Sequence, residues 1–239
     1  MRYSLVIPAH NEADNLPPLL AEIRALPEGL RPCEVILVDD ASADATASVM
    51  SAQIAADPTL RLLRLAKRAG QSAAMLAGVK AARSDWVATI DADGENDPAD
   101  LPRMIALAED SRADLVGGQR PSRRPSWSKQ LASRLANSVR RRALKDGCSD
   151  SACGLKLFRR ELLLQLPSFD GMHRFLPALV QIAGGQTRFV GVNDRPRRHG
   201  RSNYGNLGRA ARGLIDLGGV LWLKRRSLAG AVRTAKEGP

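Results

Sequence analysis

The chain has 239 residues, of which 44% are hydrophobic and 26% charged, so it can form a sizeable globular domain and is too apolar for a disordered protein. Aromatic residues make up only 4%, which argues against a surface that stacks nucleic-acid bases. The net charge of +11 is uneven: residues 1–118 carry 11 Lys/Arg and 18 Asp/Glu, whereas residues 119–239 carry 25 and 7. The second half therefore predicts an anionic partner, for which phosphate groups, anionic lipids and nucleic acid are candidates.

Cysteine spacing and hydropathy indicate the compartment. Cys33, Cys148 and Cys153 form no CxxC pair, which predicts a reducing cytosol without a disulfide framework. The N-terminus lacks a long apolar signal region, and no run approaches the roughly 18 apolar residues that span a bilayer. We therefore expect a cytoplasmic protein that touches a membrane without crossing it.

Short apolar runs alternate with helical patterns along the first half. Strands are expected at 3–8, 34–40, 60–65, 86–90 and 113–118, and helices at 12–26, around 47–50, at 70–82 and at 97–110. This alternation predicts an α/β fold, with a mostly parallel sheet covered by helices on both faces. Ligands of such sheets bind beyond the carboxyl ends of the strands, where Pro8, Asp39, Asp40 and the carboxylates of 91–97 fall, so we expect these residues to converge.

The pattern changes after residue 118. The sequence predicts a basic loop at 120–129, an amphipathic helix at 130–145, a short strand and turn at 154–162, a helix with an internal proline at 173–185, a strand at 187–193 and a basic loop at 195–205. An amphipathic segment follows at 206–226, and residues 227–239 are expected to be frayed or disordered. No linker separates two independent domains.

The segment TIDADGENDP (89–98) places Asp91, Asp93, Glu95 and Asp97 at alternate positions directly after a strand. One interpretation is a solvated turn, in which Asp97 before Pro98 caps a helix. A calcium loop of the EF-hand type is excluded, because Gly and Glu are missing from the positions that it requires. The third is a site for Mg²⁺ or Mn²⁺, which bind one or two carboxylates together with substrate phosphates.

Seven ordered blocks extend this interpretation over about residues 3–224. They are VIPAHNEADNL (6–16), VILVDDASADAT (35–46), RAGQSAAMLAG (68–78), IDADGENDP (90–98), GGQR (117–120), SACGLKLFRRE (151–161) and RPRRHGRSNYG (195–205). In these blocks the chain resembles the family-2 inverting glycosyltransferases, similar to dolichol-phosphate mannose synthases and bacterial polyprenyl-phosphate glycosyltransferases. The resemblance implies a fold of the GT-A type. It also implies metal-dependent, inverting transfer of a sugar from a nucleotide-sugar to a polyprenyl phosphate.

The resemblance assigns roles on the donor side. The nucleotide pocket would be lined by Pro8, His10, Glu12, Asp39, Gln71 and Asp91, and the metal held by Asp91, Asp93 and Glu95. Glu95 stands where the mannose synthases usually carry Gln. The extra charge favours metal retention, although contact with a sugar hydroxyl stays open.

On the acceptor side, the resemblance assigns the lipid phosphate to Arg120, Lys129 and Ser133, with Lys129 in place of the family's Arg. Arg197 and Arg201, in a loop that folds over the donor, would neutralise the leaving diphosphate. Residues 1–205 would form the catalytic domain, with a donor-binding half at 1–118 and an acceptor-binding half at 119–205.

Several alternatives remain open at this stage. A lipid phosphate is largely ionised at neutral pH and needs no general base, whereas a hydroxyl acceptor would need a carboxylate, for which Asp150 is the candidate. A nucleic-acid-binding protein is a rival of another class, opposed by the acidic cluster and the scarce aromatics, and a catalytically idle regulatory relative is another. We expect no nucleic-acid partner.

The segment 206–226 could either lie in the membrane interface or pack on the domain. We expect a peripheral enzyme on the inner face of the membrane, in contact with its anionic surface, and an integral membrane partner stays open.

Overall fold

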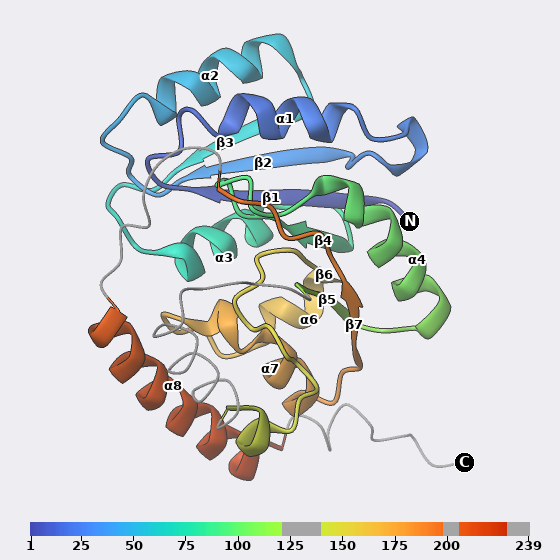
Figure 1. Cartoon of the computed structure of the whole chain (residues 1–239), viewed down its shortest axis with the longest axis vertical. Helices are drawn as coiled ribbons and strands as arrows, with labels where there is room; N and C mark the ends of the chain where they lie inside the picture. The colour runs from blue at the N-terminus through green and yellow to red at the C-terminus, as the bar shows by residue number, and fades with distance from the viewer. Residues whose placement is uncertain (121–139, 198–205, 229–239) are drawn as a thin grey trace.

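The computed structural model describes residues 1–120, 140–197 and 206–228. Within these ranges one seven-stranded sheet has the order β3-β2-β1-β4-β6-β5-β7 (Figure 1), so the predicted mostly parallel α/β fold is confirmed. The strands are β1 Tyr3–Ala9, β2 Glu34–Asp39, β3 Leu60–Arg64, β4 Trp86–Thr89, β5 Leu115–Gln119, β6 Lys156–Arg159 and β7 Thr187–Gly191. The longer helices are α1 Leu16–Arg24, α2 Thr46–Ala56, α3 Gln71–Ala81, α4 Leu101–Ser111, α7 Leu176–Ile182 and α8 Asn206–Arg226.

Helices cover both faces of the sheet, as the alternating pattern predicts (Figure 1). Buried side chains of α1, α2 and α4 pack with alternate residues of β1 and β2, among them Leu5 and Leu37. Val6 and Ile36 point to the opposite face, where they join α3, α7 and α8. A Cβ on Gly78 of α3 would lie 2.4 Å from Val6, so α3 packs directly against the sheet. Two apolar layers therefore fix the strand ends that carry the polar residues.

Strand β6 runs antiparallel between two strands that are parallel to the rest of the sheet. Lys156 pairs with Thr89 of β4 and with Gly117 of β5. Because β6 runs in the opposite direction, its first residue lies at the edge where β4 and β5 end. The loop that precedes β6 is thereby brought to the carboxyl ends of the parallel strands. The sequence pattern did not predict this strand order.

Several predicted boundaries need correction. The helix expected at 12–26 is shorter, because residues 12–15 form a turn and Pro17 and Pro18 occupy the first helical turn. The segment 97–110 divides into a 3₁₀ helix, Pro98–Asp100, and α4. Asp97 accepts a hydrogen bond of 2.9 Å from the Ala99 N–H, which confirms the predicted cap.

In the second half, the turn expected after β6 is a short helix, α6 Arg160–Leu164. The proline expected inside a helix at 173–185 lies instead in the first turn of α7, where its missing N–H is not needed, and a 3₁₀ turn at Met172–Arg174 precedes it. Most of the helix expected at 130–145 lies outside the described residues. Among those described, no helix has the length and apolar character required to cross a bilayer.

Glu34 joins three segments at the amino ends of the strands. Its Oε1 accepts hydrogen bonds of 2.7 Å from the Ser4 hydroxyl and from the Arg83 N–H, and its Oε2 accepts one of 2.5 Å from Arg61. Burial alone would raise the pKa of Glu34, but the Arg83 N–H, the Arg61 guanidinium and the Ser4 hydroxyl together hold this pKa below its ordinary value. The carboxylate therefore stabilises the folded state while it is ionised.

The substitution Glu34→Gln is expected to lower the free energy of unfolding at pH 7 by about 1–2 kcal/mol. Because the folded-state pKa lies below the unfolded-state pKa, this stability is present above the unfolded-state value and is lost as pH falls through the folded-state value. Urea unfolding of both proteins at decreasing pH measures it. A difference that stays constant with pH would contradict the prediction.

Candidate active site

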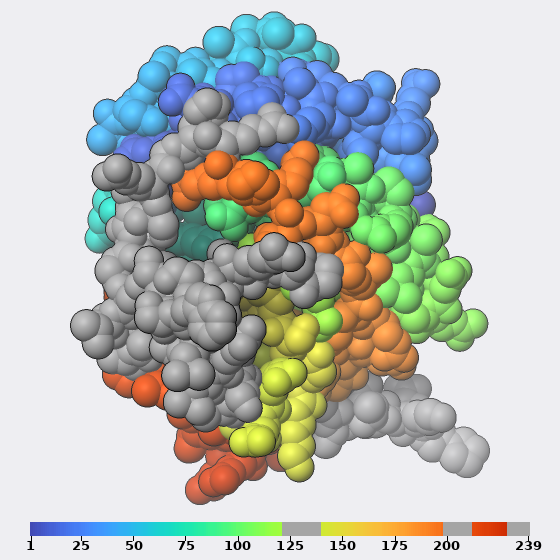
Figure 2. Space-filling model, in the orientation of Figure 1, coloured from blue at the N-terminus to red at the C-terminus, as the bar shows by residue number. Residues whose placement is uncertain are grey.

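Polar residues from distant parts of the sequence meet at the carboxyl ends of β1, β2 and β4. Pro8 lies near the end of β1, Asp39 ends β2, and Asp91 follows β4. These strands are neighbours in the sheet, so the predicted convergence is confirmed. Figure 2 shows a hollow on this face, with teal and green atoms at its floor and the orange segment after β7 at its rim.

The loops after β1 and β2 hold each other in place. The carboxylate of Asp40 accepts hydrogen bonds from the N–H groups of Ala69 (2.7 Å) and Gly70 (2.9 Å), so it fixes the turn that opens α3. The carbonyl of Asp40 lies 2.8 Å from Nδ1 of His10. The carboxylate of Asp40 therefore already has hydrogen-bond donors within the protein, and the side chain of His10 is held by the Asp40 carbonyl.

Asp39 is fully buried and differs from Asp40 in its partners. Its Oδ1 accepts a hydrogen bond of 2.9 Å from the Ser42 N–H. Arg64 lies 3.4 Å from its Oδ2, but no described residue donates a hydrogen bond to this oxygen. A buried acceptor without a donor is costly unless a ligand supplies one. Oδ2 of Asp39 is thus available to an N–H or O–H group.

Asp91 packs against the backbone of Gly154. Its Oδ1 accepts a hydrogen bond of 2.7 Å from Nε2 of Gln71, which opens α3 as predicted. A Cβ on Gly154 would lie 2.2 Å from the Asp91 carboxyl group. Burial and the neighbouring carboxylate of Asp93 raise the pKa of Asp91 to about 7. A bound cation would relieve this crowding of negative charge.

The close approach at Gly154 gives a prediction. Gly154→Ala is expected to lower kcat/KM for the sugar transfer that the resemblance implies about 100-fold, because the added Cβ displaces Asp91 by an ångström or more. The matched control is Gly191→Ala, since a Cβ there meets no atom within 4 Å. Steady-state kinetics of both variants, together with circular dichroism to confirm folding, tests this. Equal activity of the two variants would contradict the proposed position of Asp91.

Arg197 reaches back to the first strand and to the acidic loop. It donates a hydrogen bond to Glu12, and its Nη1 lies 3.8 Å from Oδ2 of Asp93. Glu12 also accepts a hydrogen bond of 2.6 Å from Asn15. Burial raises the pKa of Glu12 despite these donors. Glu12, Asp93 and Arg197 therefore form one cluster that joins residues 185 positions apart.

Arg120 is a buried cation of the site, with a side chain only 3% exposed. It donates to both oxygens of Asp150, at 2.7 and 3.2 Å, and to Oε2 of Glu95 at 3.2 Å. Oδ1 of Asp194 lies 3.8 Å from its Nη1. Burial alone would lower the pKa of Arg120, but the hydrogen bonds and charge of Asp150 outweigh burial and raise it. Arg120 thus holds together carboxylates from three segments.

The segment after β7 crosses the acidic loop. Asn96 and Asp194 form an antiparallel bridge, and the Arg195 N–H donates to the carbonyl of Glu95 at 3.1 Å. The Arg195 side chain donates to the Asn96 carbonyl and to Glu22, at 2.7 and 2.8 Å. Two segments about 100 residues apart in sequence are therefore fixed to each other.

The structure brings together the predicted site residues that it describes. The structure gathers Pro8, His10, Glu12, Asp39, Gln71, Asp91, Asp93, Glu95, Arg120 and Arg197, whereas Lys129, Ser133 and Arg201 lie outside the described residues. The carboxylate of Glu95 contacts Arg120, so its role as a metal ligand stays a prediction.

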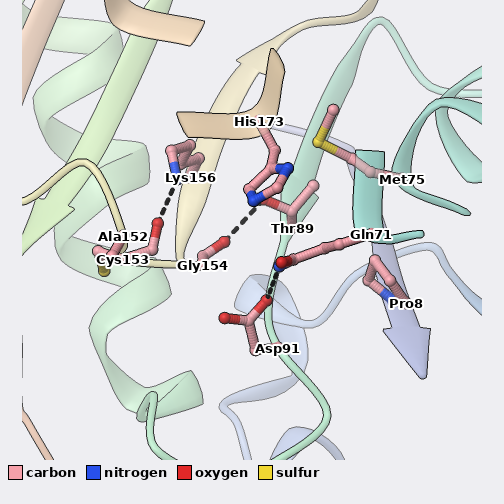
Figure 3. A pocket seen from close by; sticks show the side chains of 10 residues that line it. All are labelled: Pro8, Gln71, Met75, Thr89, Asp91, Ala152, Cys153, Gly154, Lys156 and His173. Carbon is pink, nitrogen blue, oxygen red and sulfur yellow. Dashed lines mark hydrogen bonds between the residues drawn. The ribbon is translucent and has the colours of Figure 1, made fainter. Parts of the chain in front are cut away.

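Sequence analysis assigned no role to Asp194, Arg195 or Lys156. Lys156 lies inside the block SACGLKLFRRE and opens the strand Lys156–Arg159, and no local pattern marked it as part of a pocket. It lines a small pocket with Asp91 and His173 (Figure 3).

The described residues contain no group of three or more His, Cys, Asp or Glu side chains arranged to hold a metal ion. Mg²⁺ and Mn²⁺ do not require such a cage, because they bind through one or two carboxylates and complete their coordination with phosphates and water. Asp93, with a side chain 19% exposed beside the raised-pKa Asp91, fits this mode of binding.

Comparison with known proteins agrees with the fold. Residues 4–166 match the sequence pattern described as glycosyl transferase family 2. The chain is 34% identical over 230 residues to a dodecaprenyl-phosphate galacturonate synthase of Rhizobium johnstonii, covering 94% of this chain and 68% of that protein. It is also 34% identical over 205 residues to an undecaprenyl-phosphate 4-deoxy-4-formamido-L-arabinose transferase of Serratia proteamaculans, covering 85% of this chain and 63% of the relative.

Among solved structures, the chain is similar to the glucosyl-3-phosphoglycerate synthase of Mycobacterium tuberculosis, in a complex with Mn²⁺, UDP-glucose and phosphoglyceric acid. The TM-score is 0.68 at 21% identity, and the alignment covers 93% of this chain and 79% of that one. This likeness supports the GT-A type of fold. With a family match over more than half of its residues, the chain belongs to glycosyl transferase family 2.

Proposed function

We propose that this glycosyltransferase moves a sugar from a nucleotide-sugar to a polyprenyl phosphate, with inversion at the anomeric carbon and with the help of a divalent cation. The observation that carries the proposal is the similarity, over 85–94% of the chain, to two relatives whose names both specify a polyprenyl-phosphate acceptor. Their sugars differ, so the sugar stays open.

The donor is assigned to the edge formed by β1, β2 and β4. Oδ2 of Asp39 is available to a base N–H or a ribose hydroxyl, because no described residue donates a hydrogen bond to it. Arg197, held between Glu12 and Asp93, lies where its charge can stabilise a leaving diphosphate. The Mycobacterium tuberculosis neighbour holds UDP-glucose, which supports this kind of donor.

A divalent cation fits beside Asp93 and Asp91, and the neighbour with Mn²⁺ supports this assignment. Such an ion, when bound, stabilises the negative charge that develops on the diphosphate oxygens. Two residues orient the carboxylate of Asp91 that would bind the cation. Gln71 donates a hydrogen bond to one of its oxygens, and Gly154 leaves room for it because it has no side chain.

The transfer requires no proton to move. An ionised phosphate oxygen of the lipid attacks the anomeric carbon, its new C–O bond replaces the bond to the donor diphosphate, and the nucleoside diphosphate leaves. The geometry of Asp150 favours this acceptor over a hydroxyl. Arg120 binds both oxygens of Asp150, and a carboxylate in such a bidentate ion pair is a poor proton acceptor.

A panel of nucleotide-sugars, incubated with undecaprenyl phosphate and with Mg²⁺ or Mn²⁺, tests the proposal. Mass spectrometry of the lipid fraction should detect a lipid-linked monosaccharide with at least one donor, and chelation of the metal should abolish it. Modification of a soluble glycan without any lipid product would contradict the proposal.

Helix α8 supports the expected contact with a membrane. Leu217 and Val220 are buried in the apolar layer shared with α7, so one side of the helix packs on the domain. The other side exposes Leu214, Ile215 and Trp222, which are 61–75% exposed. The sequence left open whether this segment packs on the domain or lies in the membrane interface. One face of α8 packs on the domain, and the opposite, apolar face is suited to the membrane interface.

The basic residues at the end of α8, Lys224, Arg225 and Arg226, match the charge of an anionic bilayer. We propose that α8 places the enzyme on the inner face of the membrane, next to its lipid acceptor. An integral membrane partner remains part of the proposal.

Combined replacement of Leu214, Ile215 and Trp222 by glutamine is expected to weaken binding to anionic vesicles about tenfold or more, because three apolar side chains no longer enter the interface. Vesicle co-sedimentation measures this, with neutral vesicles as the control and donor binding in solution as the test of folding. Unchanged vesicle binding would contradict a membrane role for α8.

A further inference from the structure

Lys156 is a buried lysine at the floor of the candidate site. It is 5% exposed and opens β6, between the ends of β4 and β5. Its ammonium donates a hydrogen bond to the carbonyl of Cys153, which holds the side chain against the wall of the pocket (Figure 3). An ammonium has three N–H donors, so this bond leaves donors for a further acceptor.

Among the residues that the structure describes, the ammonium of Lys156 has no direct counterion. No ion pair joins it to a carboxylate within the described residues, which differs from the buried Arg120 and Arg140 with their Asp150 and Asp146 partners. Asp91 is close enough to interact electrostatically and lies elsewhere on the same pocket. Burying an ammonium without an ion pair is costly, and such charges are usually paired.

The pocket that Lys156 lines shares Asp91 with the expected metal site. It is bounded by the ends of β1 and β4, the start of α3 and the loop before β6. Asp91, His173 and Thr89 belong to its lining, whereas Asp93 and Arg197 do not. Ligand atoms in this pocket would therefore lie near both Asp91 and Lys156.

From these observations we infer that Lys156 is a binding residue for an anionic oxygen group of the donor, which supplies a counterion that none of the described residues provides. The inference rests on the proposed function, because it assumes that a nucleotide-sugar occupies the site. The anionic oxygens can come from the donor diphosphate or from a carboxylate on the sugar, and a comparison of donors distinguishes the two.

The test compares the wild-type protein with Lys156→Met and Lys156→Gln. Glutamine can still donate to the Cys153 carbonyl but carries no charge. Titration calorimetry with UDP, UDP-glucose and UDP-glucuronate is expected to show dissociation constants about 10- to 100-fold higher for both variants. Weaker binding of all three probes would show that Lys156 contacts the phosphates. Weakening with UDP-glucuronate alone assigns the sugar carboxylate.

A control and a second measurement separate binding from structure. Lys80→Met removes an exposed lysine at the far end of α3 and should leave all three affinities unchanged. Without ligand, Lys156→Met is expected to melt at the wild-type temperature or above it, because it removes a buried charge that lacks an ion pair. A melting temperature lower by about 4 °C or more would show that Lys156 stabilises the fold, and would overturn the inference.

The outcomes also separate this inference from the proposed function. If the wild-type protein binds a nucleotide-sugar and both Lys156 variants bind it equally well, the inference fails while the proposed function stands. If the wild-type protein binds neither these probes nor the corresponding nucleotide-sugars of other bases, the proposed function fails and the inference fails with it.

Discussion

The substitution Asp93→Ala is expected to lower the rate of sugar transfer about 10²- to 10⁴-fold without unfolding the protein. The physical reason is the loss of a carboxylate that fits a divalent cation, whose stabilisation of the leaving diphosphate is worth several kcal/mol. Asp93 is partly exposed and accepts one backbone hydrogen bond, from Glu95 at 3.1 Å, so its removal disturbs the fold little. Single-turnover rates at increasing Mn²⁺ measure the loss.

Asp97→Asn is the matched control for this variant. Asp97 belongs to the same acidic loop, but its Oδ1 caps the helical turn at Ala99 and its Oδ2 accepts a hydrogen bond of 3.2 Å from Asn193. Its replacement is expected to affect stability slightly and the rate hardly at all. If Asp93→Ala keeps more than a tenth of the wild-type rate, the assignment of the metal to this loop is wrong.

The substitution Arg120→Met is expected to produce the largest loss of stability, about 3 kcal/mol. It leaves Glu95, Asp150 and Asp194 facing one another without the guanidinium that now separates them. The side chain of Arg120 is 3% exposed, so water screens these charges poorly. We expect sugar transfer to fall as well, because the acidic loop and the loop before β6 lose their shared contact.

Urea unfolding measures the effect, and Arg103→Met is the control. Arg103 also pairs with a buried carboxylate, that of Asp100, but its own side chain is 56% exposed, so its removal is expected to cost about 1 kcal/mol or less. Equal losses for the two variants would contradict the central place of Arg120 in the site.

Local features of the sequence predicted much of the fold. The alternation of apolar runs and helical patterns predicted a parallel sheet, and β1, β2 and β3, which follow one another along the chain, are neighbours in it. The cap at Asp97 was also predictable, because its hydrogen bond reaches only two residues ahead. The position of β6 was not, because it depends on pairing between Lys156 and a strand some 70 residues earlier.

In the candidate site, too, some residues could be predicted from local sequence and others depend on contacts between distant segments. Residues at the ends of predicted parallel strands, such as Asp39 and Asp91, were expected to meet because topology alone brings them together. The partners of Arg120 were not predictable, since Glu95 and Asp150 approach it from segments 25 and 30 residues away. Lys156 was missed because a lysine in a short strand gives no sign of the pocket that it enters.

A matched pair of acceptors tests most directly whether the acceptor is a lipid phosphate. The wild-type protein is incubated with an active nucleotide-sugar, Mn²⁺, and either undecaprenyl phosphate or undecaprenol, which differ only in the phosphate group. We expect a glycosyl phosphodiester from the first and no product from the second. A glycosylated undecaprenol, or equal inertness of both lipids while a soluble glycan is modified, would contradict this expectation.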